Sequence, residues 1–326
     1  MPFRLFFAAF IMAASASAAF SSESENHEVR ELLKKMVTAV HTLNYEGTFV
    51  LLHGNQLESM QVIHTLHNGG ERERLISLNG AAREVVRDDV SVTCITPDSK
   101  SISIGNRIVG RGFTAVFFMD LDKLSAYYTF FLLGEERVAN RDTIVVGIIP
   151  KDDYRYGYRI YLDKSHILPL KTDMLNASGN AVSQVMFTHL NVDDSVKDLA
   201  EAAIVGKEDY SWIQQKPVTW LQQDAREDGW DFSNLPKGFS VTLHARKSIE
   251  IGGPEIDHFV ISDGLASLSL YAEKSIKVSG LRGNSVIGAV NAFGTEYNGY
   301  QITVVGEVPS LTVELVARSL RRQIDD

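Results

Sequence analysis

Apolar and polar residues alternate along three neighbouring segments in the middle of the chain. Between Tyr154 and Leu162 every second residue is apolar, and the residues between them are mostly polar or charged. This period is typical of a β-strand with one buried face. The alternation resumes in 168–174 and in 182–190, each time after a short turn-forming stretch. The sequence therefore predicts an antiparallel meander in a curved sheet that covers apolar material.

The third of these runs defines which side chains should face inward. Its period places Val182, Gln184, Met186 and Leu190 on one face. That face is expected to be the buried one, because the apolar face of a half-buried strand packs on the core.

A helix and further strands are predicted before the meander. Apolar residues recur at three- and four-residue spacing from Ser24 to Leu43, and Ser24 or Asn26 can cap the start of a helix. Strand-like runs follow at 45–53, 57–67, 71–78, 83–87 and 90–96. These segments predict a large antiparallel sheet with a helix packed on it.

Residues 105–134 interrupt the strand pattern with a concentration of aromatic rings. The apolar residues between Leu121 and Phe131 fit one face of a helix that Asp120 would cap and Gly134 would end. Two interpretations stay open: the rings fill an ordinary core, or they line a cavity for an acyl chain or a peptide side chain. The candidate lipid-binding residues are Phe49, Leu51, Phe117, Phe118, Tyr128 and Phe131.

A second domain is expected after a connecting segment. The strand rhythm is lost from Asn191 to Gln223, apart from a short helical stretch near Val196. About five strands and a C-terminal helix at 309–322 then predict a small α+β domain of ordinary size. The expected organisation is α+β, with a signal peptide at 1–19, a large domain at 20–190, a linker at 191–223 and a small domain at 224–326.

The N-terminus has the three parts of a secretory signal peptide. A basic start at Arg4 precedes the apolar run 5–14, and small residues follow up to Ala19. The apolar run is shorter than the roughly 20 residues that span a bilayer. We therefore expect cleavage near Ala18 or Ala19, no membrane span, and export of the mature chain.

Charge and candidate chemistry favour a binding protein. The formal net charge of −9 argues against a nucleic-acid partner, which requires clustered basic residues. His64 and His67 would point to opposite faces of a strand, a poor geometry for chelation. No nucleophile stands beside a base in a known catalytic motif. We expect no enzyme activity and neither a metal nor a cofactor.

Several segments, in order along nearly the whole mature chain, resemble the signature segments of the RseB/MucB family. They are 43–49 (LNYEGTF), 73–75 (ERL), 78–80 (LNG), 83–87 (REVVR), 137–141 (RVANR), 150–158 (PKDDYRYGY), 168–171 (LPLK), 262–266 (SDGLA) and 304–309 (VVGEVP). Because they are long and occur in the same order, the resemblance is specific.

The resemblance implies a function in sigma factor regulation. Members of this family are periplasmic regulators that bind the periplasmic domain of a membrane-spanning anti-sigma factor, of the RseA or MucA type, and shield it from proteolysis. It also implies a large domain similar to the unclosed β-barrel of LolA and LolB, into which lipopolysaccharide or another acyl ligand enters and releases the partner. Binding of the two ligands would then be thermodynamically linked.

The partner surface is expected on exposed turns of the small domain and on the linker. The candidate partner-binding residues are Trp212, Ser262, Asp263, Leu265, Arg282 and Asn284. A homodimer is left open. The alternative function is a periplasmic lipid or lipoprotein carrier of the LolA/LolB type, which the large domain suits equally well but which needs no second domain.

Overall fold

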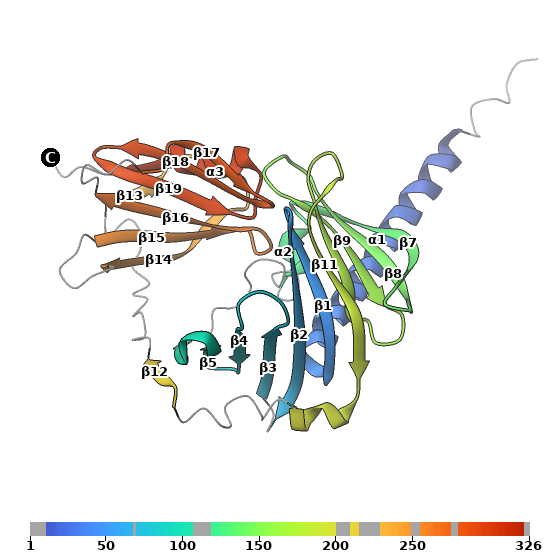
Figure 1. Cartoon of the computed structure of the whole chain (residues 1–326). Helices are drawn as coiled ribbons and strands as arrows, with labels where there is room; N and C mark the ends of the chain where they lie inside the picture. Colours follow the sequence, from blue (N-terminus) through green and yellow to red (C-terminus); the bar gives the residue numbers. More distant parts are fainter. Residues whose placement is uncertain are drawn as a thin grey trace, which may run out of the picture.

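Two β-sheets form the two units of the chain (Figure 1). The computed structural model describes residues 11–67, 70–106, 119–199, 209–214, 229–248, 255–274 and 280–322. Among these residues the larger sheet has twelve strands and the smaller one six.

The larger sheet is antiparallel and open. Its spatial order is β12-β6-β5-β4-β3-β2-β1-β11-β10-β9-β8-β7, and β12 alone runs parallel to its neighbour, β6. The strands are β1 Tyr45–His53, β2 Gln56–His67, β3 Gly70–Ser77, β4 Glu84–Arg87, β5 Ser91–Thr96, β6 Ser101–Asn106, β7 Tyr128–Val138, β8 Arg141–Pro150, β9 Gly157–Asp163, β10 Pro169–Leu175, β11 Ala181–Val192 and β12 Ser211–Gln214. The predicted meander, now β9 to β11, and the predicted unclosed antiparallel barrel are confirmed.

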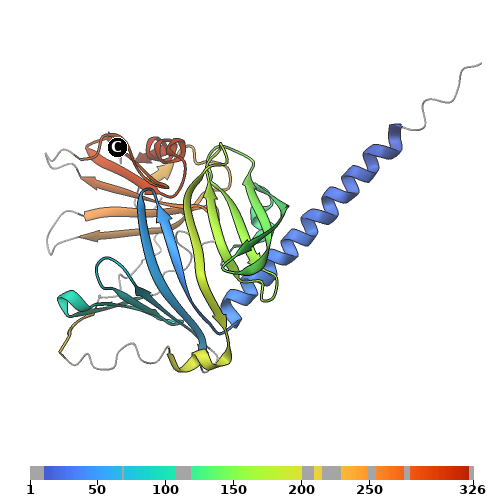
Figure 2. The same ribbon diagram turned by 45° about the vertical axis from the view of Figure 1, so that its right-hand side comes forward.

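The C-terminal half of the helix α1 (Ile11–Thr42) packs on the core of this sheet, and its N-terminal half projects away from the sheet (Figure 2). Val29, Leu33 and Met36 are fully buried, as the helical spacing predicted. The predicted start at Ser24 or Asn26 is wrong, because the helix continues through both residues. The segment from residue 11 to residue 42 contains no Gly or Pro that would end it.

The predicted helix across 120–134 is wrong beyond its first turn. The helix α2 (Leu121–Leu124) is capped by Asp120, as expected, but β7 begins at Tyr128 and pairs with β8 along its whole length. The run from Thr129 to Leu133 is apolar or β-branched at every position, so it suits a strand once β8 offers a partner. Residues 107–118 lie outside the described part of the chain.

The inward face predicted for β11 is also wrong in part. Val185, Phe187 and Leu190 face the core, whereas Met186 lies on the outer face and is exposed. The register between β1 and β11 shifts after Thr48, so that Thr188 is an extra residue on β11. A β-bulge of this kind changes which alternate positions face inward.

The small domain packs one helix on a six-stranded antiparallel sheet. The strand order is β14-β15-β16-β19-β18-β17. Its elements are β14 Ser240–Ser248, β15 Glu255–Ser262, β16 Ser267–Lys274, β17 Gly283–Ile287, β18 Val290–Tyr297, β19 Tyr300–Gly306 and α3 Ser310–Ser319, beside a two-stranded pair of β13 Trp230–Phe232 and β20 Leu320–Arg322. The helix buries Val313 and Val316, as predicted. The segment 285–291 forms part of a hairpin of β17 and β18 that turns at Gly288, where φ is +59°.

Two short 3₁₀ helices complete the described elements, η1 Pro97–Ser99 and η3 Asp194–Leu199. The second coincides with the start of the helix expected near Val196, and residues 200–208 lie outside the described part. The signal peptide also falls largely outside it: residues 1–10 are not described, and 11–19 are described only as part of α1. Among the described residues, no helix combines the length and the apolar character needed to cross a membrane.

Candidate functional site

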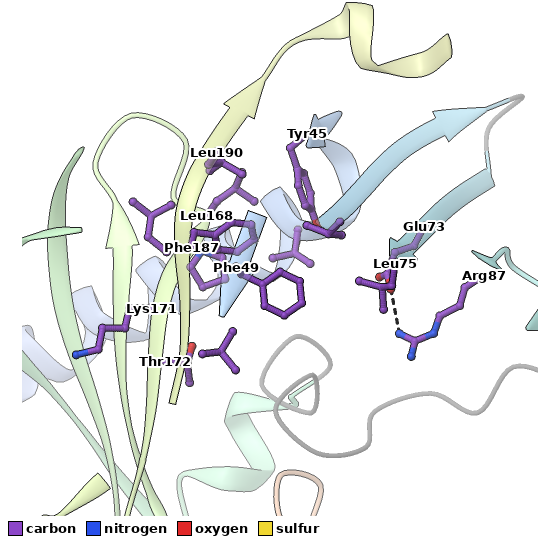
Figure 3. A pocket seen from close by; sticks show the side chains of 15 residues that line it. Tyr45, Phe49, Glu73, Leu75, Arg87, Leu168, Lys171, Thr172, Phe187 and Leu190 are labelled. Carbon is purple, nitrogen blue, oxygen red and sulfur yellow. Dashed lines mark hydrogen bonds and ion pairs between the residues drawn. The ribbon is translucent and has the colours of Figure 1, made fainter. Parts of the chain in front are cut away.

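An apolar cavity lies between α1 and the inner face of the large sheet (Figure 3). Residues of β1, β3 and β11 that lie on one face of their strands line it, as the strand period requires, and the consecutive residues 168–172 line it at the start of β10. Its lining residues are Val40, Tyr45, Phe49, Val62, Glu73, Leu75, Arg87, Leu168, Pro169, Leu170, Lys171, Thr172, Val185, Phe187 and Leu190. Most of these side chains are aliphatic or aromatic, so the site suits hydrocarbon.

Two aromatic rings form one wall of the cavity. The ring centroids of Phe49 and Phe187 are 5.6 Å apart and the rings are tilted by 51°. Phe187 has room because Gly47 lies beneath it: a Cβ on Gly47 would lie 2.9 Å from the Phe187 ring and 2.5 Å from the His189 carbonyl oxygen. The glycine and the neighbouring bulge therefore position both rings.

A few polar groups border the apolar cavity. Arg87 on β4 donates to Glu73 on β3 across 3.0 Å, and both side chains are partly exposed. Deeper in, Tyr45 stacks on His64 with their ring centroids 4.8 Å apart. Burial, with the nearby carboxylates of Glu73 and Glu71, raises the pKa of Tyr45, while burial lowers the pKa of His64. Both rings are therefore uncharged at neutral pH, which keeps the interior apolar.

The cavity has a volume of about 90 Å³. Pockets for drug-sized ligands have about 300–1,000 Å³. The site as it stands therefore accepts part of one hydrocarbon chain, and a larger lipid requires the surrounding strands and α1 to move apart.

A buried ion pair joins the two domains. The Nε of Arg155, in the turn before β9, donates to Asp263 Oδ2 at 2.5 Å, and both side chains are fully buried. Asp263 also accepts hydrogen bonds from the Tyr128 hydroxyl and from the backbone N–H groups of Leu265 and Ala266. The carboxylate is thus fully paired, which is the condition for keeping a charge away from water.

The guanidinium of Arg155 is enclosed on all sides. It also bonds to the Asp152 carboxylate and the Lys237 carbonyl oxygen, and it lies 4.7 Å from the Phe239 ring centroid and 4.9 Å from that of Tyr127. Burial lowers the pKa of Arg155, but the bonds to its two carboxylate partners outweigh this and leave it raised. Arg155 therefore stays charged and fixes the arrangement of the domains.

Neutral hydrogen bonds extend this interface. The Asn291 side chain donates to the Tyr156 hydroxyl at 2.9 Å, and the Thr312 hydroxyl donates to the Tyr154 carbonyl oxygen at 2.8 Å. The segment 150–158, singled out by its sequence, thus lies at the domain interface, although Arg155 was expected on a solvent-facing side.

The structure brings together few of the predicted lipid-binding residues. Phe49 lines the cavity, and Leu51 packs on the same core without lining it. Tyr128 is buried at the domain interface, and Phe131 is 41% exposed on β7, so neither lines the cavity. The reason is that β7 is a strand, which separates the two rings. Phe117 and Phe118 lie outside the described residues.

The predicted partner-binding residues divide into two groups. Trp212, Arg282 and Asn284 are exposed. Asp263 and Leu265 are buried between the domains and Ser262 is half-buried, so the expectation that this turn is exposed is wrong. A Ser-Asp-Gly turn read in isolation faces solvent, whereas docking of the large domain covers it.

Sequence reasoning missed most of the cavity. Leu75, Val185 and Phe187 line it from three strands. The alternation within the predicted strands was a usable signal for Leu75, but the bulge at Thr188 concealed the inward face of β11. Among the described residues, no group of three or more His, Cys, Asp or Glu side chains is placed to hold a metal ion.

Comparison with known proteins assigns both domains. The profile of the MucB/RseB N-terminal domain matches residues 28–205, and that of the MucB/RseB C-terminal domain matches residues 224–321. The sigma factor AlgU regulatory protein MucB of Pseudomonas aeruginosa is 30% identical over 90% of this chain and 91% of its own length.

Solved structures of MucB match the whole two-domain arrangement. Two structures of its complex with MucA, one of them with MucA(peri), give TM-scores of 0.72 and 0.70 at 26% and 27% identity, covering 91% of this chain and 100% of MucB. A structure of MucB by itself gives 0.64 at 27% identity, covering 91% of this chain and 98% of that one. This chain is therefore more similar in structure to MucB in the two complexes than to MucB alone.

Proposed function

This chain belongs to the MucB/RseB family, and on that premise we propose that it binds the periplasmic domain of a membrane-spanning anti-sigma factor of the RseA/MucA type. The complex of MucB with MucA(peri), which this chain matches across both domains, carries the proposal. Binding takes place in the periplasm, consistent with the exported N-terminus expected from the sequence. The bound partner is shielded from proteolysis, and no chemical step is required.

A lipid ligand reverses the binding in this proposal. Lipopolysaccharide or another acyl ligand places one hydrocarbon chain in the cavity beside Phe49 and Phe187, where each buried CH₂ contributes about 0.8 kcal/mol. The volume of about 90 Å³ means that entry moves the surrounding strands. That movement lowers partner affinity, and by linkage the partner lowers lipid affinity by the same factor.

The strand β1 offers a direct route between the cavity and the domain interface. Phe49 lies in the cavity wall, and His53, at the end of the same strand, contacts the Ile287 carbonyl oxygen of the small domain at 2.9 Å. A strand transmits displacement along its length because its backbone is held on both sides, here by β2 and β11.

Titration of the purified mature protein against periplasmic segments of anti-sigma factors from the same cell tests the proposal. Binding at micromolar Kd or tighter, about −8 kcal/mol or stronger, and its reversal by lipopolysaccharide are expected. If lipopolysaccharide does not change the affinity for the partner, only the proposed reversal of binding by lipid is contradicted. Lipid binding with no protein partner would instead favour the carrier, which the apolar cavity also suits.

Matched variants locate the lipid. Phe49→Ala is expected to weaken acyl-chain binding, whereas Phe131→Ala, on the exposed part of β7, should leave it unchanged. Because emptying a core position also destabilises, Leu75→Phe serves as a second variant that fills the cavity. Equal lipid affinity in Phe49→Ala, Leu75→Phe and the parent would exclude this cavity as the lipid site.

A further inference from the structure

The outer face of the large sheet is apolar where a solvated antiparallel sheet is normally polar. Leu52 and Leu57 lie directly opposite each other on β1 and β2, and Leu57 is 57% exposed. Met186 on β11, opposite Val50, is exposed on the same face. Leu78 adjoins them, since its N–H donates to the carbonyl of Ser59 on β2 at 2.8 Å. Contiguous exposed apolar groups of this kind mark interaction sites.

This face continues onto the small domain. The tip of the β1–β2 hairpin meets the β17–β18 hairpin, where His53 Nε2 contacts the Ile287 carbonyl oxygen and a Cβ on Gly288 would lie 2.8 Å from the backbone N of Gly54. Figures 1 and 2 both place this tip beside the small domain. On β17, Val286 and Ile287 are 60% and 68% exposed, and as neighbours on a strand they point to opposite sides of it. We call the set Leu52, Leu57, Leu78, Met186, Val286 and Ile287 the junction surface.

The strand β17 adds backbone groups to this surface. It is an edge strand, exposed or half-buried along its length, and no strand in the described part of the chain pairs with its outer side. Of the other sheet edges, β14 and β7 carry charged residues such as Arg246 and Glu136, which discourage pairing, and β12 (SWIQ) is an uncharged strand of only four residues. β17 (GNSVI) carries no charge. Its outer side is therefore suited to accept an extended segment as an added strand.

We propose that the junction surface binds an extended apolar segment of the anti-sigma partner, an inference that rests on the proposed function. The surface is continuous only while the two hairpins touch, so it depends on the domain arrangement. Over the whole chain the TM-scores are 0.72 and 0.70 with MucB in its two complexes and 0.64 with MucB alone. A partner that spans both hairpins stabilises this arrangement, and a ligand that alters it releases the partner.

Charged substitutions on the junction surface test the proposal. The variant Leu57→Lys/Ile287→Lys is compared with Leu133→Lys/Val90→Lys, a matched control at exposed apolar positions away from the surface. Calorimetric titration uses synthetic peptides that tile the periplasmic segments of the anti-sigma factors from the same cell. The junction variant should bind at least tenfold more weakly than the parent, and the control within twofold. Circular dichroism and lipopolysaccharide binding should match the parent in both variants.

Each other outcome overturns a defined part of the reasoning. If the junction variant binds the peptides with the affinity of the parent, the junction surface is not the binding site, and the proposed function is unaffected. A parent protein that binds no peptide overturns both. Sedimentation that shows a dimer in the parent and a monomer in the junction variant, with peptide affinity unchanged, assigns the surface to a second copy of this chain instead. If the variant is misfolded, photo-cross-linking from position 287, with position 90 as control, decides whether the peptide contacts the surface.

Discussion

Replacing Asp263 with asparagine tests whether the buried ion pair holds the two domains together. Asparagine keeps the shape of the side chain, and its carbonyl oxygen can still accept the N–H groups of Leu265 and Ala266. Its amide group, however, faces the Nε of Arg155, a donor against a donor. The turn is therefore preserved while the ion pair is lost.

The magnitude follows from what remains around Arg155. Removing one partner of a buried pair costs about 3–5 kcal/mol. Arg155 keeps the Asp152 carboxylate and the Lys237 carbonyl oxygen, so its charge is not left uncompensated. We therefore expect a loss at the lower end, about 3 kcal/mol, in the free energy that docks the small domain on the large one.

Urea unfolding followed by tryptophan fluorescence measures this loss. Of the three tryptophans, Trp212 lies in β12 of the large sheet and Trp230 in the core of the small domain, so the signal reports both domains. With a urea dependence of about 2 kcal/mol per molar, the midpoint should fall by about 1.5 M. Small-angle scattering should show a larger radius of gyration, because undocked domains separate.

A double-mutant cycle with Arg155→Met isolates the pair, and an exposed pair provides the control. Arg282 and Glu296 are 2.6 Å apart but largely exposed, so Glu296→Gln should cost at most about 1 kcal/mol. The reasoning is refuted if Asp263→Asn costs no more than Glu296→Gln, or if the coupling energy between Arg155 and Asp263 is near zero.

Three further changes have defined outcomes. Gly47→Ala should lower the free energy of unfolding by about 1–3 kcal/mol, because the added Cβ would lie 2.5 Å from the His189 carbonyl oxygen. Urea titration measures this loss, and an unchanged midpoint of the urea transition would contradict the close packing at Gly47. Burial raises the pKa of Asp257, but hydrogen bonds from side chains that include Trp230 outweigh it and leave the pKa lowered. Asp257 therefore stabilises the fold above its unfolded pKa of about 3.9, and this stability is lost as pH falls through the lower folded value. Asp257→Asn should remove that part of the acid dependence of stability, measured by circular dichroism during an acid titration. Parallel titration curves for the variant and the parent would contradict this role of Asp257. Burial raises the pKa of Glu307, so its ionised form opposes folding. Glu307→Gln should therefore raise the melting temperature at pH 7 but not below about pH 4, where Glu307 is protonated in both states. An equal increase in melting temperature at both pH values would point to a cause other than charge.

Local structure could be predicted from the amino-acid sequence wherever one hydrophobic period dominates a segment. Strict alternation located β9 and β10, and β1 begins and ends where the strand-like run 45–53 predicted. Helical spacing identified the buried face of α1 and of α3, because a side chain's direction on a regular element depends only on its position. The segments that resemble the RseB/MucB family also indicated the family correctly. Two of them, 150–158 and 262–266, contain Arg155 and Asp263, which are hydrogen-bonded to each other in the structure.

How these elements pack together depends on long-range contacts. The residues from Leu121 to Phe131 satisfy helical spacing, yet pairing with β8 makes Tyr128 to Val138 a strand, since cross-strand hydrogen bonds outweigh a weak local preference. The bulge at Thr188 turned Met186 outward and brought Phe187 into the cavity. Asp263 looked exposed because its burial comes from a partner 108 positions away, Arg155. Long-range contacts of this kind have no period in the chain, and for this reason the cavity and the domain interface could not be derived from the sequence.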